Sequence, residues 1–90
     1  MIRKVLELVN KIPIEERRKL RGLAFIVEKN MFQISEEGQF IAGQYFANNS
    51  IVFYENFIYT DEDLKNVFIH ELCHHFGMDE EQVRNYMNKK

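Results

Sequence analysis

The sequence predicts an α+β fold: a small mixed β-sheet with a hairpin, packed against helices, in a single domain over residues 1–90. Apolar residues recur at helical spacing toward both ends of the chain, whereas the middle is rich in aromatic and β-branched residues. A chain of 90 residues has room for one hydrophobic core. Its composition, 46% hydrophobic and 29% charged, is that of an ordinary globular domain.

The first half of the chain predicts two helices and a strand. Helical spacing of apolar residues predicts a first helix over about residues 2–11, and Pro13 ends that pattern. Pro13 then opens a short second helix that ends near Gly22. The continuous apolar stretch over 23–27 predicts a buried strand.

A hairpin is predicted next, after a loop that ends near Gly38. Residues 39–46 and 51–54 are aromatic and β-branched, which is typical of strands. Asn48 and Asn49 lie between them and can adopt the positive φ values of a tight turn. These two strands are therefore expected to pair with each other.

Two helices are expected at the C-terminal end. Thr60 can cap a long helix over about residues 61–76, and acidic residues in its first turn favour the helix dipole. Gly77 is a natural left-handed terminator for that helix. Asp79, with Gln82 three residues later, has the pattern of a cap for a last helix that runs to the C-terminus.

Charge and cysteine content exclude several classes of protein. The formal net charge is −2, and the short basic run over 17–21 is interpreted as a solvated helix face, so no nucleic-acid partner is expected. No apolar run is long enough for a membrane span or a signal-peptide core, so no membrane association is expected. A single cysteine, Cys73, cannot form an internal disulfide and predicts a cytoplasmic location.

All three histidines of the chain lie within residues 70–75, and their spacing predicts a metal site. His70 and His74 are one helical turn apart, so both imidazoles can bind one ion, and imidazole is a good zinc ligand. Glu71 lies beside His70 on the same face, where its carboxylate can reach a zinc-bound water. The expected cofactor is zinc, and the expected chemistry is hydrolysis with Glu71 as general base.

The motif continues as His70-Glu71-x-x-His74-x-x-Gly77-x-x-Glu80. A glycine three residues after the second histidine lets the chain leave the helix sharply, so position 80 can return toward the ion as a third ligand. Over about residues 40–90 the chain resembles the minimal zincin-like metallopeptidases of bacteria, whose signature HExxHxxGxxD lies near the C-terminus. The resemblance implies a zinc peptidase with an aspartate ligand where this chain has Glu80. Asp79 is kept as the alternative third ligand.

Other residues near the motif are expected to have no role in the site. Cys73 is interpreted as a small buried thiol. His75 is rotated by about 100° from His74 on a regular helix and is interpreted as a surface residue, with a smaller chance that it assists an oxyanion. The tyrosines in and after the predicted strands are interpreted as packing residues: Tyr45, Tyr54 and Tyr59.

The sequence is compatible with two functions. The first is a metallopeptidase whose peptide or protein substrate lies along an exposed edge of the sheet, with activity that the small size of the domain keeps weak or restricted to one partner. The second is a zinc-stabilised module that binds a protein without cleaving it. Glu71 favours the enzyme, because a purely structural zinc site has no need of a glutamate beside an open coordination position.

Overall fold

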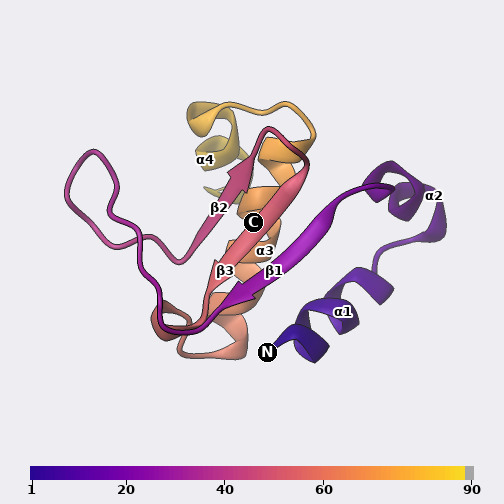
Figure 1. Ribbon diagram of the computed structural model, residues 1–90. Helices are drawn as coiled ribbons and strands as arrows, with labels where there is room; N and C mark the ends of the chain where they lie inside the picture. Colours follow the sequence, from indigo (N-terminus) through magenta and orange to yellow (C-terminus); the bar gives the residue numbers. More distant parts are fainter. Residues whose placement is uncertain (89–90) are drawn as a thin grey trace.

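The computed structural model describes residues 1–88 and confirms the α+β fold (Figure 1). The sheet has three strands of mixed direction, and helices cover one of its faces. The elements in chain order are α1 (Ile2–Asn10), α2 (Ile14–Arg17), the 3-10 turn η1 (Arg18–Leu20), β1 (Ala24–Glu28), β2 (Gly43–Phe46), β3 (Ser50–Tyr54), the 3-10 turn η2 (Glu55–Phe57), α3 (Asp61–His75) and α4 (Glu80–Asn88). The last two residues, into which the predicted final helix extended, lie outside the described part of the chain.

The strand order is β1-β3-β2, so β3 is central and β2 is an edge strand. β1 pairs with β3 in parallel, and β2 pairs with β3 in antiparallel register, with Gly43 opposite Phe53. The predicted hairpin is confirmed, and of its two asparagines Asn49 takes the positive φ, at 65°. This leaves the outer edge of β2 without a neighbouring strand among the described residues.

The predicted start of the first hairpin strand at residue 39 is wrong, because β2 begins only at Gly43. The preceding residues form a loop closed by a single bridge between Ile34 and Phe40, with Gly38 in the left-handed region at its tip. Phe40 stacks on Phe57 of η2 with ring centroids 4.8 Å apart. The aromatic side chains of this segment thus pack on each other and on η2, and the segment does not pair in the sheet.

The core lies between the sheet and α3. Side chains of α3, including Leu64 and Phe68, pack with Ile51 and Phe53 of β3 and with Val5 of α1. Figure 1 shows α3 running behind the strands along their length. Because α3 is fixed by this packing, the histidines near its C-terminal end are held against a rigid scaffold.

Both ends of α3 are formed as the sequence predicts. The Thr60 hydroxyl accepts from the Asp63 backbone N–H, and the Asp63 carboxylate accepts from the Thr60 N–H, which completes a capping box. At the other end Gly77 has φ 94°, the left-handed conformation that glycine adopts at low cost. The direction in which the chain leaves α3 is therefore set by one residue.

The interpretation of the basic run as a solvated face is wrong for Arg17. Its guanidinium donates to the backbone carbonyls of Asn10 and Ile12, at 2.9 and 2.8 Å. These carbonyls lie at and just beyond the end of α1, where helical partners are missing. Arg17 therefore ties the second helix to the end of the first.

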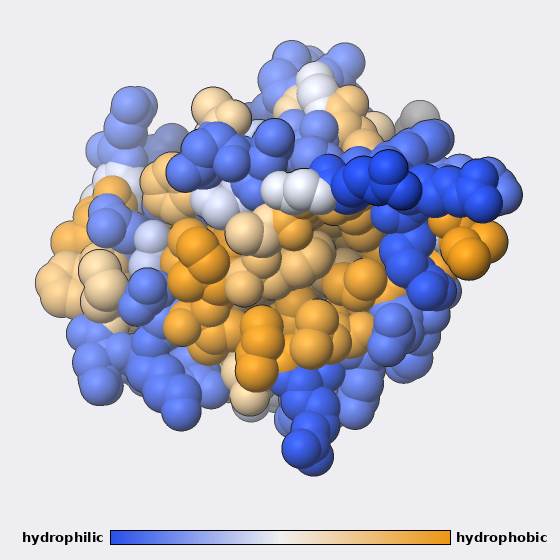
Figure 2. All heavy atoms as spheres, turned by 45° about the vertical axis from the view of Figure 1, so that its right-hand side comes forward, coloured by the Kyte–Doolittle hydropathy of each residue, from blue (hydrophilic) through white to orange (hydrophobic). Residues whose placement is uncertain are grey.

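One face of the molecule carries an apolar surface. Figure 2, which brings the α1 and α2 side forward, shows hydrophobic side chains gathered over the centre of this face and bordered by hydrophilic ones. The large exposed apolar residues of these elements and of β1 are Ile2, Leu6, Ile14 and Ile26. Among the described residues, no helix has the length and apolar character needed to cross a bilayer.

Candidate metal centre

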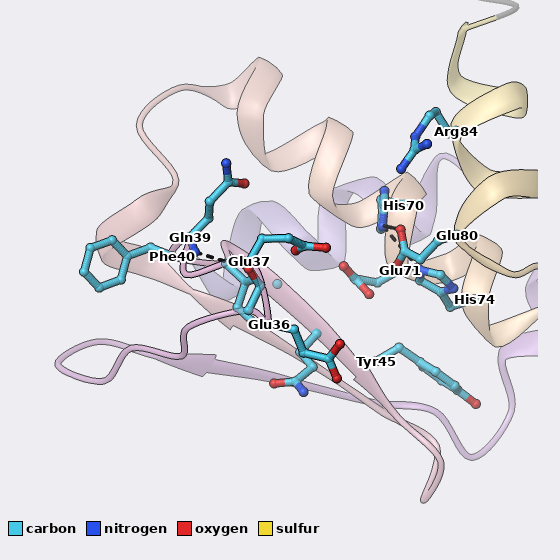
Figure 3. A pocket seen from close by; sticks show the side chains of 14 residues that line it. Glu36, Glu37, Gln39, Phe40, Tyr45, His70, Glu71, His74, Glu80 and Arg84 are labelled. Atoms are coloured by element: carbon cyan, nitrogen blue, oxygen red, sulfur yellow. Dashed lines mark hydrogen bonds and ion pairs between the residues drawn. The ribbon is translucent and has the colours of Figure 1, made fainter.

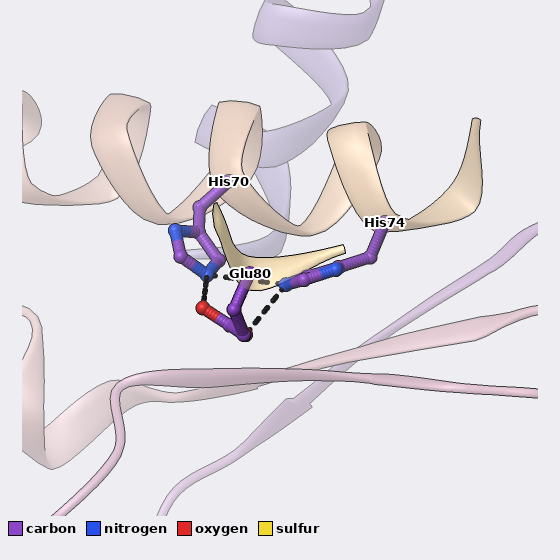
Figure 4. Close-up of side chains that lie close together, drawn as sticks. All are labelled: His70, His74 and Glu80. Carbon is purple, nitrogen blue, oxygen red and sulfur yellow. Dashed lines mark hydrogen bonds and ion pairs between the residues drawn. The ribbon is translucent and has the colours of Figure 1, made fainter. Parts of the chain in front are cut away.

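The turn between α3 and α4 brings Glu80, a candidate third ligand, back to the two histidines. After Gly77, the backbone N–H of Met78 donates to the Cys73 carbonyl. Asp79 then caps α4: its carboxylate accepts from the Gln82 N–H at 2.8 Å, and the Gln82 side chain accepts from the Asp79 N–H at 2.9 Å. As a result Glu80 begins α4 directly opposite His70 and His74 (Figure 4).

His70, His74 and Glu80 form a compact donor group. One ligand atom from each lies within 4.8 Å of the others. The two Nε2 atoms are 3.3 Å apart, and the Glu80 carboxylate lies 2.8 Å from His74 Nε2 and 3.5 Å from His70 Nε2. These three side chains are close enough to bind one metal ion.

The His74 ring is oriented by a backbone carbonyl. Its Nδ1 lies 3.0 Å from the Met78 oxygen, and a carbonyl can only accept, so Nδ1 carries the proton. In the neutral ring Nε2 then has a free lone pair, and it points at the Glu80 carboxylate and at His70. Acceptors that converge in this way need a positive charge between them, either a proton or a metal ion.

The donor set fits zinc in its chemistry, and the two imidazoles fit it in their spacing. Two imidazoles and one carboxylate are the ligands of many catalytic zinc sites, which keep a fourth position open. Two donors about 2.0 to 2.1 Å from a tetrahedral ion lie about 3.3 to 3.4 Å apart. The 3.3 Å separation of the two Nε2 atoms matches this spacing.

Glu71 lies next to this group but in a different environment. Its side chain is only 7% exposed, although it follows the half-exposed His70 directly in sequence. Burial raises the pKa of the Glu71 carboxyl above its ordinary value, while the nearby imidazoles and the backbone N–H of Tyr45, which donates to it, oppose that rise. The carboxyl is thus held between the donor group and the edge strand β2.

β2 approaches α3 so closely that only glycine fits at its first position. A Cβ placed on Gly43 would collide with the Val67 side chain and would lie 3.5 Å from Glu71 Cγ. This approach brings the edge of β2 to the donor group and buries Glu71. The Tyr45 N–H, which points away from β3, is thereby available to the Glu71 carboxylate.

A cleft of about 820 Å³ opens over the donor group (Figure 3). One wall is the loop before β2, which contributes Glu36, Glu37 and Phe40, and the opposite side is formed by α3 and α4. The edge of β2 contributes Gly43, Gln44 and Tyr45. The donor group and Glu71 are therefore accessible from a groove that runs beside a free strand edge.

The remaining candidates from the sequence have other positions. Cys73 is buried, as expected. The interpretation of His75 as a surface residue is wrong, because it is half-buried and its ring nitrogens lie 3.3 Å from the Tyr45 hydroxyl and 3.3 Å from the Lys19 carbonyl oxygen. Asp79 caps α4 and does not belong to the donor group.

Two features of the cleft were not assigned from the sequence. The sequence assigns Tyr45 no role in the site, yet its backbone contacts Glu71 and its side chain lines the cleft. Arg84 lines the cleft from α4. The signal for Arg84 was present, since it lies four residues after Glu80 and so shares its helix face. No such local signal exists for Tyr45, whose contact depends on the strand register.

Comparison with models of known protein families, with curated proteins and with solved structures finds no match. The resemblance to minimal zincins accordingly stays a prediction, carried by the motif over residues 70–80.

Proposed function

We propose that this protein is a zinc-dependent metallopeptidase of the minimal zincin type, with His70, His74 and Glu80 as zinc ligands and Glu71 as general base. The observation that carries the proposal is the position of Glu71: a buried carboxyl between a three-residue donor group and a free strand edge. A structural zinc site does not require such a carboxyl, whereas hydrolysis does. The proposal includes a cytoplasmic location, which the lone Cys73 suits.

The free edge of β2 supplies a binding mode for the substrate. An extended peptide can add to this edge through main-chain hydrogen bonds, which places its backbone in the cleft beside Glu71. Antiparallel addition is the slightly more stable arrangement. The expected substrate is therefore an extended peptide or protein segment.

Each residue then has a defined task. Zinc, when bound, lowers the pKa of water and polarises the scissile carbonyl. Glu71 accepts a proton from the attacking water as that oxygen bonds to the carbonyl carbon, and it later donates the proton to the leaving nitrogen as the C–N bond breaks. Burial raises the pKa of Glu71 and a nearby cation lowers it, so the carboxyl can both accept and release this proton.

The direct test is a peptide-library digest with zinc-loaded protein, analysed by mass spectrometry. We expect cleavage that stops when a chelator removes the metal and returns when zinc is restored. If the loaded protein cleaves nothing while a protein partner co-purifies with it in stoichiometric amount, the binding-module alternative replaces the peptidase.

The assignment of the third ligand predicts a difference between two neighbouring alanine variants. Glu80→Ala should weaken zinc binding by roughly tenfold or more, because it removes a ligand. Asp79→Ala should keep zinc and lower the free energy of unfolding by about 1 kcal/mol, because it removes only a helix cap. Zinc titrations in competition with a chelator, with urea unfolding of the same samples, measure both effects. Release of zinc by Asp79→Ala alone would reverse the assignment.

A further inference from the structure

Arg84 places a cation beside the donor group. It lies on α4 one turn after Glu80, and in Figure 3 its guanidinium points toward His70. Arg84 is exposed, and within residues 1–88 no carboxylate lies within ion-pair distance of it. The guanidinium is therefore available to an anionic ligand in the cleft.

The groove continues past the donor group into a second chamber of about 650 Å³. Arg84 borders both parts of the groove, together with His70, Glu71 and Glu80. The side chains that line this chamber alone are apolar or carry amides: Ala42, Asn66, Val67, Met87 and Asn88. Such a chamber suits an apolar side chain beside a polar group that hydrogen-bonds to amides.

The direction of a bound peptide relates this chamber to one end of the substrate. The assignment of this chamber to one end of a substrate rests on the proposed function. A peptide antiparallel to β2 runs from the Tyr45 end of the strand toward the Gly43 end. The second chamber contains Gly43 and the residues before it, Ile41 and Ala42, but not Tyr45. The chamber therefore receives the part of the peptide that lies on the C-terminal side of the donor group.

Charge distinguishes the two parts of the groove. Glu36 and Glu37 line the part that contains Tyr45, and neither lines the second chamber. A carboxylate ligand is repelled by these glutamates and attracted by Arg84. A guanidinium binds a carboxylate through two parallel hydrogen bonds, which fixes its orientation as well as its position.

We propose that Arg84 binds the free C-terminal carboxylate of the substrate, with the apolar side chain of the last residue in the second chamber. The protein then acts near the C-termini of peptides. One water is consumed, the C–N bond breaks, and the products are a new carboxylate on the longer piece and a free amine on the released C-terminal residue or short peptide.

The test measures binding without cleavage. Zinc-loaded Glu71→Gln protein is titrated with acetyl-Ala-Ala-Ala-Leu and with the same peptide as its C-terminal amide, and amide chemical shifts are followed by NMR. We expect the acid to bind about tenfold more tightly than the amide, since only the acid pairs with the guanidinium. Adding Arg84→Gln should remove this preference, and Arg84→Lys should restore part of it.

Arg21→Gln in the same background is the matched control, because Arg21 is exposed and lines neither part of the groove. It should keep the preference for the acid. Equal binding of acid and amide, binding of neither peptide, or an acid preference that survives Arg84→Gln would each overturn the proposal. Failure of the proposed function has a different signature: the preference for the acid is present, but wild-type protein cleaves no peptide.

Discussion

Replacing Glu71 by glutamine is expected to lower the rate of peptide hydrolysis by about a hundredfold to ten-thousandfold while zinc stays bound. Glutamine has nearly the same shape and can still lie between α3 and β2, but its amide cannot take a proton from water. The variant separates the two proposed functions, because a binding module has no use for the proton acceptor. Initial rates on a peptide found in the library digest, with zinc content measured on the same sample, give the result.

Glu81→Gln is a suitable control for this substitution. Glu81 is exposed in the first turn of α4 and lines neither part of the groove, so its loss should leave the rate unchanged. Equal cleavage by the wild type and by Glu71→Gln would contradict the assignment of the base. The free energy of unfolding of metal-free wild type should also fall relative to that of metal-free Glu71→Gln as the pH rises, because burial raises the pKa of the Glu71 carboxyl and so opposes its ionisation in the folded state.

The double variant His70→Ala, His74→Ala should bind no zinc, whereas the wild type should bind about one ion per chain. Two of the three donors are lost, and Glu80 alone on the surface cannot hold the ion. Zinc affinity of the wild type should fall as the pH is lowered, because imidazole binds a metal only in its neutral form and protons compete for its lone pair. Elemental analysis after dialysis and a chelator-competition titration measure both quantities.

His75→Ala provides the control, since it removes the third histidine without touching the donor group. It should keep stoichiometric zinc. Zinc should also stabilise the wild type by about 2.7 kcal/mol when the free ion is at a hundred times its Kd, and it should not stabilise the double variant. Thermal unfolding with and without zinc detects this difference. Stoichiometric zinc in the double variant would refute the metal centre.

Local patterns predicted the elements around the site well. The Thr60 cap, the Gly77 terminator and the Asp79 cap all lie where the sequence indicated, because each depends on a few neighbouring residues. The start of β2 was predicted too early, because an apolar loop and an apolar strand look alike without knowledge of their partners. The parallel pairing of β1 with β3 and the order of the strands had no local signal.

The candidate site likewise combines features set by local spacing with features set by tertiary packing. His70 and His74 are brought together by helical spacing, which the sequence states directly. The positions of Arg17 and His75 were misjudged, since a run of charges and a residue off the motif face gave no hint of the backbone carbonyls that they contact. Those contacts depend on how α2 packs on α1 and how α3 packs on η1, which are tertiary properties.

The close approach of β2 to α3 at Gly43 means that the donor group and the burial of Glu71 depend on different parts of the chain. All three donor residues lie within residues 70–80, so binding one ion orders only a short segment of chain. The geometry of the donor group therefore depends little on the sheet. The burial of Glu71 depends instead on a contact with Gly43, 28 positions earlier in the chain. Under the proposed function, substitutions in β2 are therefore expected to alter proton transfer by Glu71 while metal affinity is preserved. Under the proposed function, a relative in which this strand has moved is expected to lose peptidase activity and still to bind its metal ion.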